Sequence, residues 1–358
     1  MHILHVVGAR PNFMKAAPVL RALSAYPDLR QTLVHTGQHY DAAMSDVFFQ
    51  QLEMPQPDYN LEIGSGTHAA QTARIMLAFE PVVLEKKPDL VLVYGDVNST
   101  VAAALVCSKL SIPIGHVEAG LRSGDRHMPE EINRLVTDQL SDLLFTPSPD
   151  GDENLLREGI DSSKIHRVGN VMIDTLIRLL PQAKSDLAHR QPYALVTLHR
   201  PSNVDDIRWL GDLLSALEDL SDKLRIVFPV HPRTRQRLQE AGLSNPTRNL
   251  AFLEPLPYLE FLGLQKNAKL VITDSGGIQE ETTFLGVSCL TVRENTERPI
   301  TITQGTNRLV GRDLTRLREA VNEILRGERE RKVCPIPLWD GHASERIAEA
   351  ILRCRMFK

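Results

Sequence analysis

The sequence of 358 residues is poor in features that mark several classes of protein. Aromatic residues make up only 5% of it, so flat surfaces on which sugar rings or bases stack are scarce and ligands must be recognised by polar groups. Lysine and arginine number 41 against 45 acidic residues, and this even balance argues against a dedicated nucleic-acid-binding protein. No apolar run approaches the roughly 18 residues that a membrane-spanning helix needs.

Cysteine is also scarce. The four cysteines, Cys107, Cys289, Cys334 and Cys354, are scattered and form no Cys-x-x-Cys pair, which argues against a disulfide framework and a zinc site. The chain opens with a strand-like segment and shows no basic stretch followed by a long apolar one. We therefore expect no secretory signal, reduced thiols and a cytoplasmic location.

Two common nucleotide-binding signatures are missing. The loop after the first predicted strand, residues 8–12, does not match GxGxxG, so the usual nicotinamide site is not supported. The P-loop pattern GxxxxGK[ST] is absent as well, which argues against P-loop nucleotide hydrolysis. We expect neither an organic cofactor nor a metal.

What the sequence does contain is a regular alternation of short apolar runs and amphipathic segments. Predicted strands cover residues 3–7, 31–35, 90–94, 114–117 and 143–145, then 194–198, 225–230, 250–252, 270–273 and 288–292. Helical patterns between them cover residues 14–25, 67–85, 99–110, 206–220 and 279–284. This alternation predicts an α/β protein with parallel sheets covered by helices on both faces.

Residues 168–191 separate the two series of strands, and they hold one helical pattern at 171–180. Each series has enough strands for its own sheet. We therefore predict two Rossmann-like, doubly wound domains with a central cleft, at residues 1–168 and 169–342. The last helical pattern lies within residues 343–358, and we expect it to pack back on the first domain.

Ligands of open parallel sheets bind at the carboxyl ends of the strands, so polar residues at these positions are candidates for a site. In chain order they are Arg10, Lys15, Asp96, Glu118, His199, Arg200, His231 and the turn at 274–277. The turn, DSGG, leads into a helix whose free N–H groups offer an anion site, although a plain capped turn has the same sequence.

The acidic and histidine candidates have both structural and catalytic interpretations. Asp96 and Glu118 follow successive strands, and paired carboxylates in one site suit acid and base chemistry. Each alone is typical of a structural role, but with PEEINR at 129–134 close downstream we favour catalysis. His199 and His231 end strands and are natural proton carriers or phosphate ligands. Glu280 or Glu281 either supports the helix dipole or binds ribose hydroxyls.

Taken together, these residues resemble the non-hydrolysing UDP-N-acetylglucosamine 2-epimerases along essentially the full chain. The shared motifs are GARP (8–11), TGQH (36–39), YGD (94–96), HVEAGLR (116–122), PEEINR (129–134), LHR (198–200), PVHP (229–232), TDSGGIQEE (273–281) and ERP (297–299). The resemblance implies the glycosyltransferase-B arrangement of two domains and a homodimer. It also implies reversible conversion of UDP-N-acetylglucosamine to UDP-N-acetylmannosamine for cell-surface polysaccharide synthesis.

The resemblance further implies a mechanism and roles for individual residues. UDP is eliminated to leave a 2-acetamidoglucal and is then added back. The implied acid and base carboxylates are Asp96, Glu118 and Glu130, with Lys15 as an active-site lysine and His199 on the phosphates. The implied UDP contacts are Arg10, His199, Ser275, Gly276, Gly277, Arg298 and, on the ribose, Glu281. The implied site for a second, activating substrate molecule includes Gln38, His39, Arg200 and His231. The resemblance does not assign one carboxylate to one epimer.

Three other functions remain open at this point. A hydrolysing 2-epimerase would release N-acetylmannosamine and UDP, and a retaining transferase of the glycosyltransferase-B type would need an acceptor site. A regulator that only binds a nucleotide sugar is disfavoured, because strand-end carboxylates repel a diphosphate and give a pure binder nothing.

Overall fold

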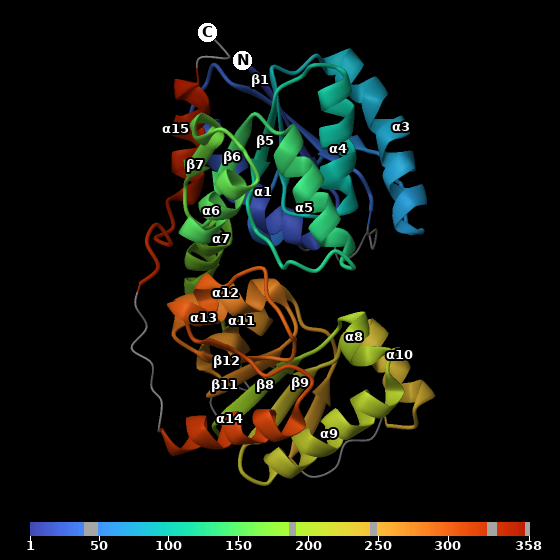
Figure 1. The fold of residues 1–358 in the computed structure, drawn as a ribbon, viewed down its shortest axis with the longest axis vertical. Helices are drawn as coiled ribbons and strands as arrows, with labels where there is room; N and C mark the ends of the chain where they lie inside the picture. The colour runs from blue at the N-terminus through green and yellow to red at the C-terminus, as the bar shows by residue number, and fades with distance from the viewer. Residues whose placement is uncertain (39–48, 186–190, 244–248, 328–334, 355–358) are drawn as a thin grey trace. The chain divides into compact units, whose positions relative to one another are not determined.

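The structure is a computed structural model that describes residues 1–38, 49–185, 191–243, 249–327 and 335–354. The chain forms two compact units (Figure 1). The first unit comprises Met1–Thr175 with Pro337–Lys358, and the second comprises Leu176–Ile336.

The first unit is built on a seven-stranded parallel sheet with the order β3-β2-β1-β4-β5-β6-β7. Its strands are β1 (His2–Val7), β2 (Arg30–His35), β3 (Tyr59–Asn60), β4 (Leu90–Tyr94), β5 (Ile114–Val117), β6 (Leu143–Thr146) and β7 (Ile165–Arg167). Its helices are α1 (Arg10–Ser24), α3 (His68–Lys86), α4 (Asn98–Lys109), α5 (Pro129–Leu140), α6 (Pro149–Arg157), η1 (Ser162–Lys164), α7 (Val171–Leu179), which begins in this unit, and α15 (Ala343–Arg353).

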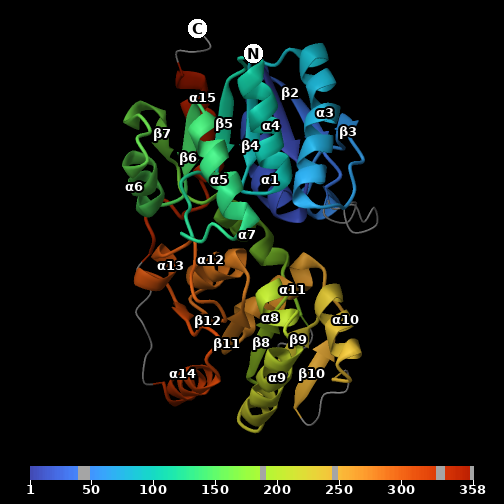
Figure 2. The same ribbon diagram turned by 45° about the vertical axis from the view of Figure 1, so that its right-hand side comes forward.

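Helices cover both faces of this sheet because the chain leaves β1 in one direction and β4 in the other. A right-handed crossover then places α1 and α4 on opposite faces. Helices α3, α4 and α5 lie side by side, whereas α1 packs against α15 (Figure 2). Alternate strand residues such as Leu4, Val6 and Val91 pack against Phe79 of α3 and Ala103 of α4 in one buried cluster.

The carboxyl-terminal segment is fixed to the first unit by specific polar contacts. Asp174 of α7 accepts hydrogen bonds from the backbone N–H groups of Ala343 at 3.1 Å and Ser344 at 2.7 Å, and so caps α15. The indole N–H of Trp339 donates to the carbonyl oxygen of Pro147 at 2.9 Å. These contacts explain why the last helix belongs to the first unit although it follows the second in sequence.

The second unit has a six-stranded parallel sheet with the order β10-β9-β8-β11-β12-β13. Its strands are β8 (Tyr193–Thr197), β9 (Arg225–Pro229), β10 (Leu250–Leu253), β11 (Leu270–Thr273), β12 (Ser288–Thr291) and β13 (Asn307–Leu309). Its helices are η2 (Leu180–Gln182), α8 (Pro201–Val204), α9 (Ile207–Ser221), α10 (Pro232–Glu240), α11 (Tyr258–Asn267), α12 (Gly276–Leu285), α13 (Ile300–Thr303) and α14 (Leu314–Arg326).

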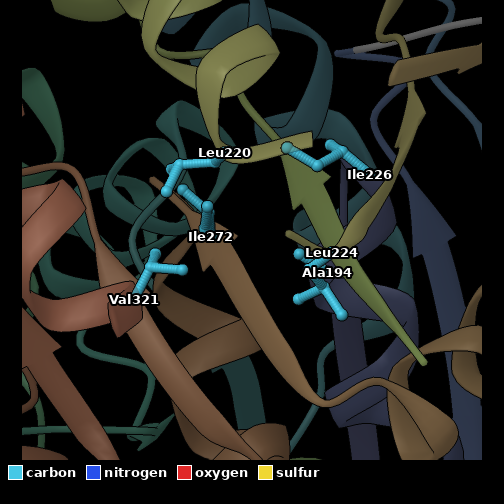
Figure 3. Close-up of a pocket in the computed structure, with 6 residues that line it drawn as sticks. All are labelled: Ala194, Leu220, Leu224, Ile226, Ile272 and Val321. Atoms are coloured by element: carbon cyan, nitrogen blue, oxygen red, sulfur yellow. The ribbon is translucent and has the colours of Figure 1, made fainter. Parts of the chain in front are cut away.

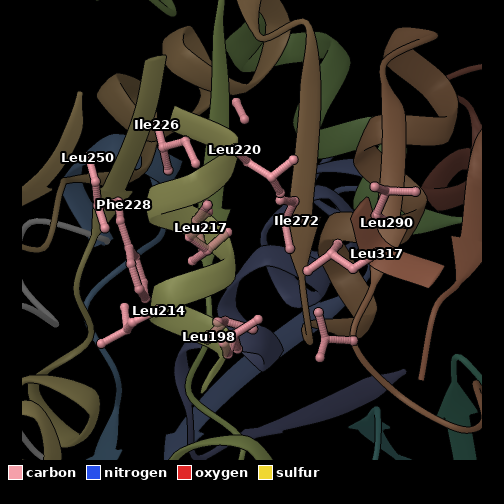
Figure 4. Packing of buried hydrophobic residues seen from close by; sticks show 14 of the residues in the cluster. Leu198, Leu214, Leu217, Leu220, Ile226, Phe228, Leu250, Ile272, Leu290 and Leu317 are labelled. Carbon is pink, nitrogen blue, oxygen red and sulfur yellow. The ribbon is translucent and has the colours of Figure 1, made fainter. Parts of the chain in front are cut away.

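The larger buried cluster of the second unit is mostly aliphatic (Figure 4). Phe228 and Ile272 of the sheet pack with Leu217 of α9 and Leu317 of α14. A small cavity inside this core is lined by aliphatic side chains alone (Figure 3), which are Ala194, Leu220, Leu224, Ile226, Ile272 and Val321. Because this lining has no polar side chain, the cavity offers nothing to orient a polar ligand.

The ten predicted strands are all present, and the predicted α/β class with two parallel sheets is confirmed. The strands that the sequence did not predict are β3, β7 and β13, which have two or three residues each and lie at sheet edges. They are too short to show an apolar run. Within the described part of the chain, no helix combines the length and apolar character needed to cross a membrane.

Candidate active site

The first group of site residues lies where β4 and β5 end. These strands are neighbours, with Tyr94 opposite Val117 in the parallel register. The residues that follow them, Asp96 and Glu118, therefore come from adjacent strand ends, as the sequence predicted.

Glu118 forms a buried ion pair with Lys15 of α1. Lys15 Nζ lies 2.6 Å from Glu118 Oε1, and the two side chains are only 5% and 3% exposed. The backbone around the pair is constrained: Glu118 itself has a φ of 75°, which is unusual for a residue with a side chain. Gly95 has a φ of 61°, and a Cβ atom there would lie 2.6 Å from Lys15 Nζ. The strained turn thus makes room for the ammonium group beside Glu118.

Asp96 is held from α5. Arg134 Nη1 lies 2.5 Å from Asp96 Oδ2, and the amide of Asn133 donates to the main-chain oxygen of Asp96 at 2.8 Å. Arg134 is buried, whereas the Asp96 side chain keeps 23% of its surface exposed. Asp96 is therefore fixed in place by its neighbours but is still accessible to a ligand.

The two glutamates at the start of α5 have different environments. Glu131 is buried and accepts hydrogen bonds from the backbone N–H groups of Ser123 and Gly124, both at 2.9 Å. Burial disfavours its charge, but these bonds and Arg134 hold the pKa of Glu131 below its usual value. Glu130 is half-buried and forms no hydrogen bond or ion pair within the described residues. Of the two, Glu130 is the one whose carboxylate is open to a ligand.

Three other residues of the first unit were predicted as ligand contacts, and they are Arg10, Gln38 and His39. Arg10 is exposed at the first position of α1. Gln38 is buried, and its Oε1 accepts hydrogen bonds from the backbone N–H of Ser99 at 3.0 Å and from the Ser99 hydroxyl at 2.7 Å. Gln38 therefore holds the start of α4. His39, predicted for an activator site, lies outside the described residues.

The second group of site residues lies at the strand ends of the second unit, around Asp274. This aspartate is fully buried after β11 and accepts hydrogen bonds from the backbone N–H groups of His199 and Arg200 and from the amide of Asn203. Its Oδ1 also lies 3.0 Å from His199 Nδ1. Burial opposes the charge of Asp274, yet these donors keep its pKa below the usual value.

The contact with Asp274 fixes the orientation of His199. With Nδ1 turned toward the carboxylate, Nε2 is on the open side of a ring that is 40% exposed. The ring of His231 lies beside it, with centroids 5.6 Å apart. His231 Nδ1 accepts a hydrogen bond from the backbone N–H of Arg233 at 3.2 Å and caps α10. With Nδ1 donating to Asp274, His199 Nε2 accepts hydrogen bonds in the neutral ring and carries an N–H group for an anion when the ring is protonated.

The glycine turn opens α12, as predicted. Ser275 is the N-cap residue and its side chain makes no capping bond, so the first N–H groups of the helix have no cap from it. A Cβ atom on Gly276 would overlap the guanidinium of Arg298 and the carboxylate of Glu297. Glycine is required here because these two charged groups pack directly against the helix start. The start of a helix is also where an anion is favoured.

The charges beside this helix are fixed by pairing. Arg298 contacts Glu297, and its Nε lies 2.9 Å from Glu280 Oε1. Glu297 is buried, and Arg298 and Arg293 hold its pKa well below the usual range despite that burial. Glu281, the predicted ribose ligand, is also buried and accepts a hydrogen bond from the Tyr258 hydroxyl at 2.8 Å. The two neighbouring glutamates thus have different partners: Glu280 holds the guanidinium of Arg298, and Glu281 binds the Tyr258 hydroxyl.

Several residues that shape the site were not singled out from the sequence. They are Asn133, Arg134, Tyr258, Arg293 and Glu297. Three of them, Asn133, Arg134 and Glu297, stand in the quoted motifs, but a motif does not show which side chain each of them contacts. Among the described residues, no group of three or more histidine, cysteine, aspartate or glutamate side chains has the geometry of a metal site.

Comparisons with known proteins identify relatives along the whole chain. The model of the family described as UDP-N-acetylglucosamine 2-epimerase matches residues 21–352. A UDP-N-acetylglucosamine 2-epimerase of Methanococcus maripaludis is 44% identical over 360 residues, which is 97% of each chain. A UDP-2,3-diacetamido-2,3-dideoxy-D-glucuronate 2-epimerase of Pseudomonas aeruginosa is 46% identical over 316 residues, 87% of this chain and 88% of the relative.

A solved structure is also similar. The crystal structure of Methanocaldococcus jannaschii UDP-GlcNAc 2-epimerase in complex with UDP-GlcNAc and UDP superposes with a TM-score of 0.92 at 42% identity. The match covers 99% of this chain and 100% of that one.

The Lys15–Glu118 pair generates a stability prediction. Lys15→Met should destabilise the first unit by about 3–5 kcal/mol, because it leaves a carboxylate buried without its ammonium partner. The double variant Lys15→Met/Glu118→Gln should recover part of that loss, and urea unfolding of the three proteins measures both effects. The matched control is Lys86→Met, which removes a lysine from a surface pair with Glu85, whose side chain is 60% exposed, and should change stability by far less. A loss in Lys15→Met no larger than in the control contradicts a structural ion pair.

Proposed function

The chain belongs to the UDP-N-acetylglucosamine 2-epimerase family, and from this premise we propose that it converts UDP-N-acetylglucosamine to UDP-N-acetylmannosamine and back. The observation that carries the proposal is that carboxylates held at the ends of β4 and β5 occur in the same chain as an anion site at the start of α12. The first set suits proton transfer and the second suits a diphosphate.

The chemistry of the sugar explains why both sets are needed. The C2 proton has no adjacent carbonyl and is not acidic in the substrate. When the bond from C1 to the β-phosphate oxygen breaks, its electron pair leaves with UDP and C1 gains oxocarbenium character. A carboxylate then removes the C2 proton, and the C1=C2 double bond of 2-acetamidoglucal forms. Protonation of C2 on the opposite face and attack of UDP on C1 give the epimer.

The second unit supplies the groups that bind and stabilise UDP. We assign the diphosphate to the N–H groups of Gly276 and Gly277 at the start of α12, together with Ser275 and Arg298; the Ser275 N–H itself already donates to the Thr273 hydroxyl at 3.0 Å. His199, oriented by Asp274, donates in its protonated form from Nε2 to the charge that grows on the leaving phosphate. Glu281 is assigned to the ribose, as the resemblance implies. Arg10 of the first unit is proposed as a further UDP contact.

The first unit supplies the groups for proton transfer. Asp96, Glu118 and Glu130 are the proposed acid and base carboxylates, and Lys15 holds Glu118. An epimerase needs a base on one face of C2 and an acid on the other, and their roles exchange in the reverse direction. More than one carboxylate is therefore required, and the accessible Asp96 and Glu130 meet that need together with Glu118. Gln38, Arg200 and His231, with His39, stay our proposal for an activator site.

A second candidate substrate comes from the Pseudomonas aeruginosa relative, whose name specifies a UDP-2,3-diacetamido-2,3-dideoxy-D-glucuronate. That sugar also carries an acetamido group at C2, so the same elimination and addition apply to it. It differs in the groups at C3 and C6. The identity to this relative, 46%, is similar to the 44% to the archaeal enzyme, so both substrates are worth testing.

One experiment separates these functions. The protein is incubated in deuterated water with each UDP-sugar, and products are followed by NMR. We expect deuterium at C2 of both epimers of UDP-N-acetylglucosamine, with little free sugar. Accumulation of free N-acetylmannosamine would identify a hydrolysing enzyme instead. Exchange only with the diacetamido sugar would identify the second substrate, and no exchange with either would contradict epimerisation.

Substitutions in the carboxylates of the first unit and in the UDP site of the second unit should affect different quantities, kcat and UDP affinity. Asp96→Asn and Glu118→Gln should lower kcat by about 100-fold or more, because each removes a proton-transfer group, while UDP affinity changes little. Gly276→Ala should do the reverse and weaken UDP binding, because the added methyl group overlaps Arg298 and Glu297. Steady-state kinetics and calorimetric titration with UDP measure both effects. Loss of UDP affinity in the carboxylate variants would make them binding groups.

We also propose a homodimer and a cytoplasmic location. Cys107 and Cys289 are buried free thiols, as in proteins of reducing compartments. For the dimer, α3 carries Leu77 and Leu84, which are 74% and 55% exposed. They are seven residues apart and so share one face of the helix. An exposed apolar face of this kind is typical of a surface that another protein chain covers.

If this face of α3 forms the dimer, Leu77→Glu/Leu84→Glu should yield a monomer, because four carboxylates would be buried at the interface. Light scattering after size exclusion should change from about twice the chain mass to 40.1 kDa. The control is Leu156→Glu on α6, where the leucine is 51% exposed, and it should remain dimeric. A wild-type monomer, or a double variant that stays dimeric, would exclude this interface.

A further inference from the structure

His116 of β5 is a fully buried histidine whose two ring nitrogens both have partners. Nδ1 lies 2.6 Å from Asp138 Oδ1, and Nε2 lies 2.8 Å from the main-chain oxygen of Gly95. A carbonyl oxygen only accepts hydrogen bonds, so Nε2 must carry a hydrogen. The protonation of the ring then depends on Asp138.

Asp138 of α5 has the surroundings of an ionised carboxylate. Its Oδ2 lies 2.7 Å from Arg122 Nη1 and accepts a hydrogen bond from the backbone N–H of Gly120 at 3.1 Å. Burial acts against its charge, but His116 and Arg122 hold the pKa of Asp138 below its usual value, and Arg122 is a cation whatever the state of His116. An ionised carboxylate only accepts, so His116 Nδ1 also carries a hydrogen.

The other neighbours of His116 are either apolar or part of a balanced group of charges. Within the sheet, His116 is paired with Val93 of β4 and Leu144 of β6, which are apolar. Arg122 also binds Glu158 at 2.6 Å. The two cations, His116 and Arg122, are therefore balanced by two carboxylates, which is what a buried charge requires.

We propose that His116 is held as an imidazolium and positions the end of β4, from which Asp96 follows. This inference rests on the proposed function for its catalytic consequence. Gly95, whose oxygen His116 binds, also makes room for Lys15 beside Glu118. His116 lies two residues before Glu118, so one buried ring connects the backbone that leads to both carboxylates.

Helix α5 holds the segment Gly95–Asp96 through three contacts. Asp138 of α5 acts through His116 on the oxygen of Gly95, Asn133 binds the oxygen of Asp96, and Arg134 binds its carboxylate. His116 does not touch the proposed substrate, so it is a positioning residue. Its loss should move Asp96 and Glu118 while the UDP groups of the second unit stay unchanged.

The protonation state can be read directly by NMR on protein labelled with ¹⁵N-histidine, with His116 assigned by comparison with His116→Phe. We expect both ring nitrogens to carry a hydrogen at neutral pH, because each of them faces a group that only accepts. In Asp138→Asn, Nε2 should keep its hydrogen and Nδ1 should lose it. One unprotonated ring nitrogen at neutral pH in the wild type overturns the imidazolium, whether or not the variants fold.

The positioning role is tested by kinetics. His116→Phe should lower kcat about 100-fold, the effect of a misplacement of about 1 Å, while UDP affinity stays within about threefold. The control is His166→Phe, a histidine of β7 in the same sheet, which should keep wild-type kcat. Unchanged kcat in His116→Phe overturns the role. If the wild type lacks epimerase activity, the proposed function fails, and the NMR result still decides the state of His116.

Discussion

The buried ion pair between Lys15 and Glu118 is the contact on which the polar end of the first sheet depends. A charged pair that is almost fully buried is stable only when both partners are fixed, since either one alone would be strongly disfavoured. The chain meets this requirement with backbone geometry. Gly95 leaves space for the ammonium group, and Glu118 adopts a left-handed φ. The nearby Asp96 is fixed by Arg134 in the same manner, so rigid carboxylates stand at adjacent strand ends.

The second unit uses a buried acid differently. Asp274 does not point toward solvent but gathers donors from the loop after β8, and through Nδ1 it orients His199. Glu297 likewise fixes arginine side chains against the first turn of α12. The acids of this unit therefore act as anchors for cations and N–H groups, which suits a ligand of negative charge. In the first unit, by contrast, the carboxylates themselves are the groups that we propose to exchange protons with the ligand.

Part of this arrangement could be predicted from the sequence. The strands and the residues that end them follow from short apolar runs, and the rule that parallel strands present their carboxyl ends together then places Asp96 and Glu118 side by side. The partners could not be predicted, because the link between Asp96 and Arg134 spans 38 residues and that between His199 and Asp274 spans 75. Nor does a sequence reveal that Glu131 is engaged by backbone N–H groups whereas Glu130 is not. Such differences depend on which side of α5 faces the loop at Ser123.

We propose that the protein inverts C2 by breaking and remaking the bond between C1 and the phosphate oxygen. Positional isotope exchange tests it directly. UDP-N-acetylglucosamine is prepared with ¹⁸O in the bridge between C1 and the β-phosphorus, incubated with the protein, recovered and examined by ³¹P NMR. We expect the label to move into non-bridging positions of the β-phosphate, because its oxygens become equivalent when UDP is released within the site. Deuterium entering C2 while all the label stays in the bridge would contradict it.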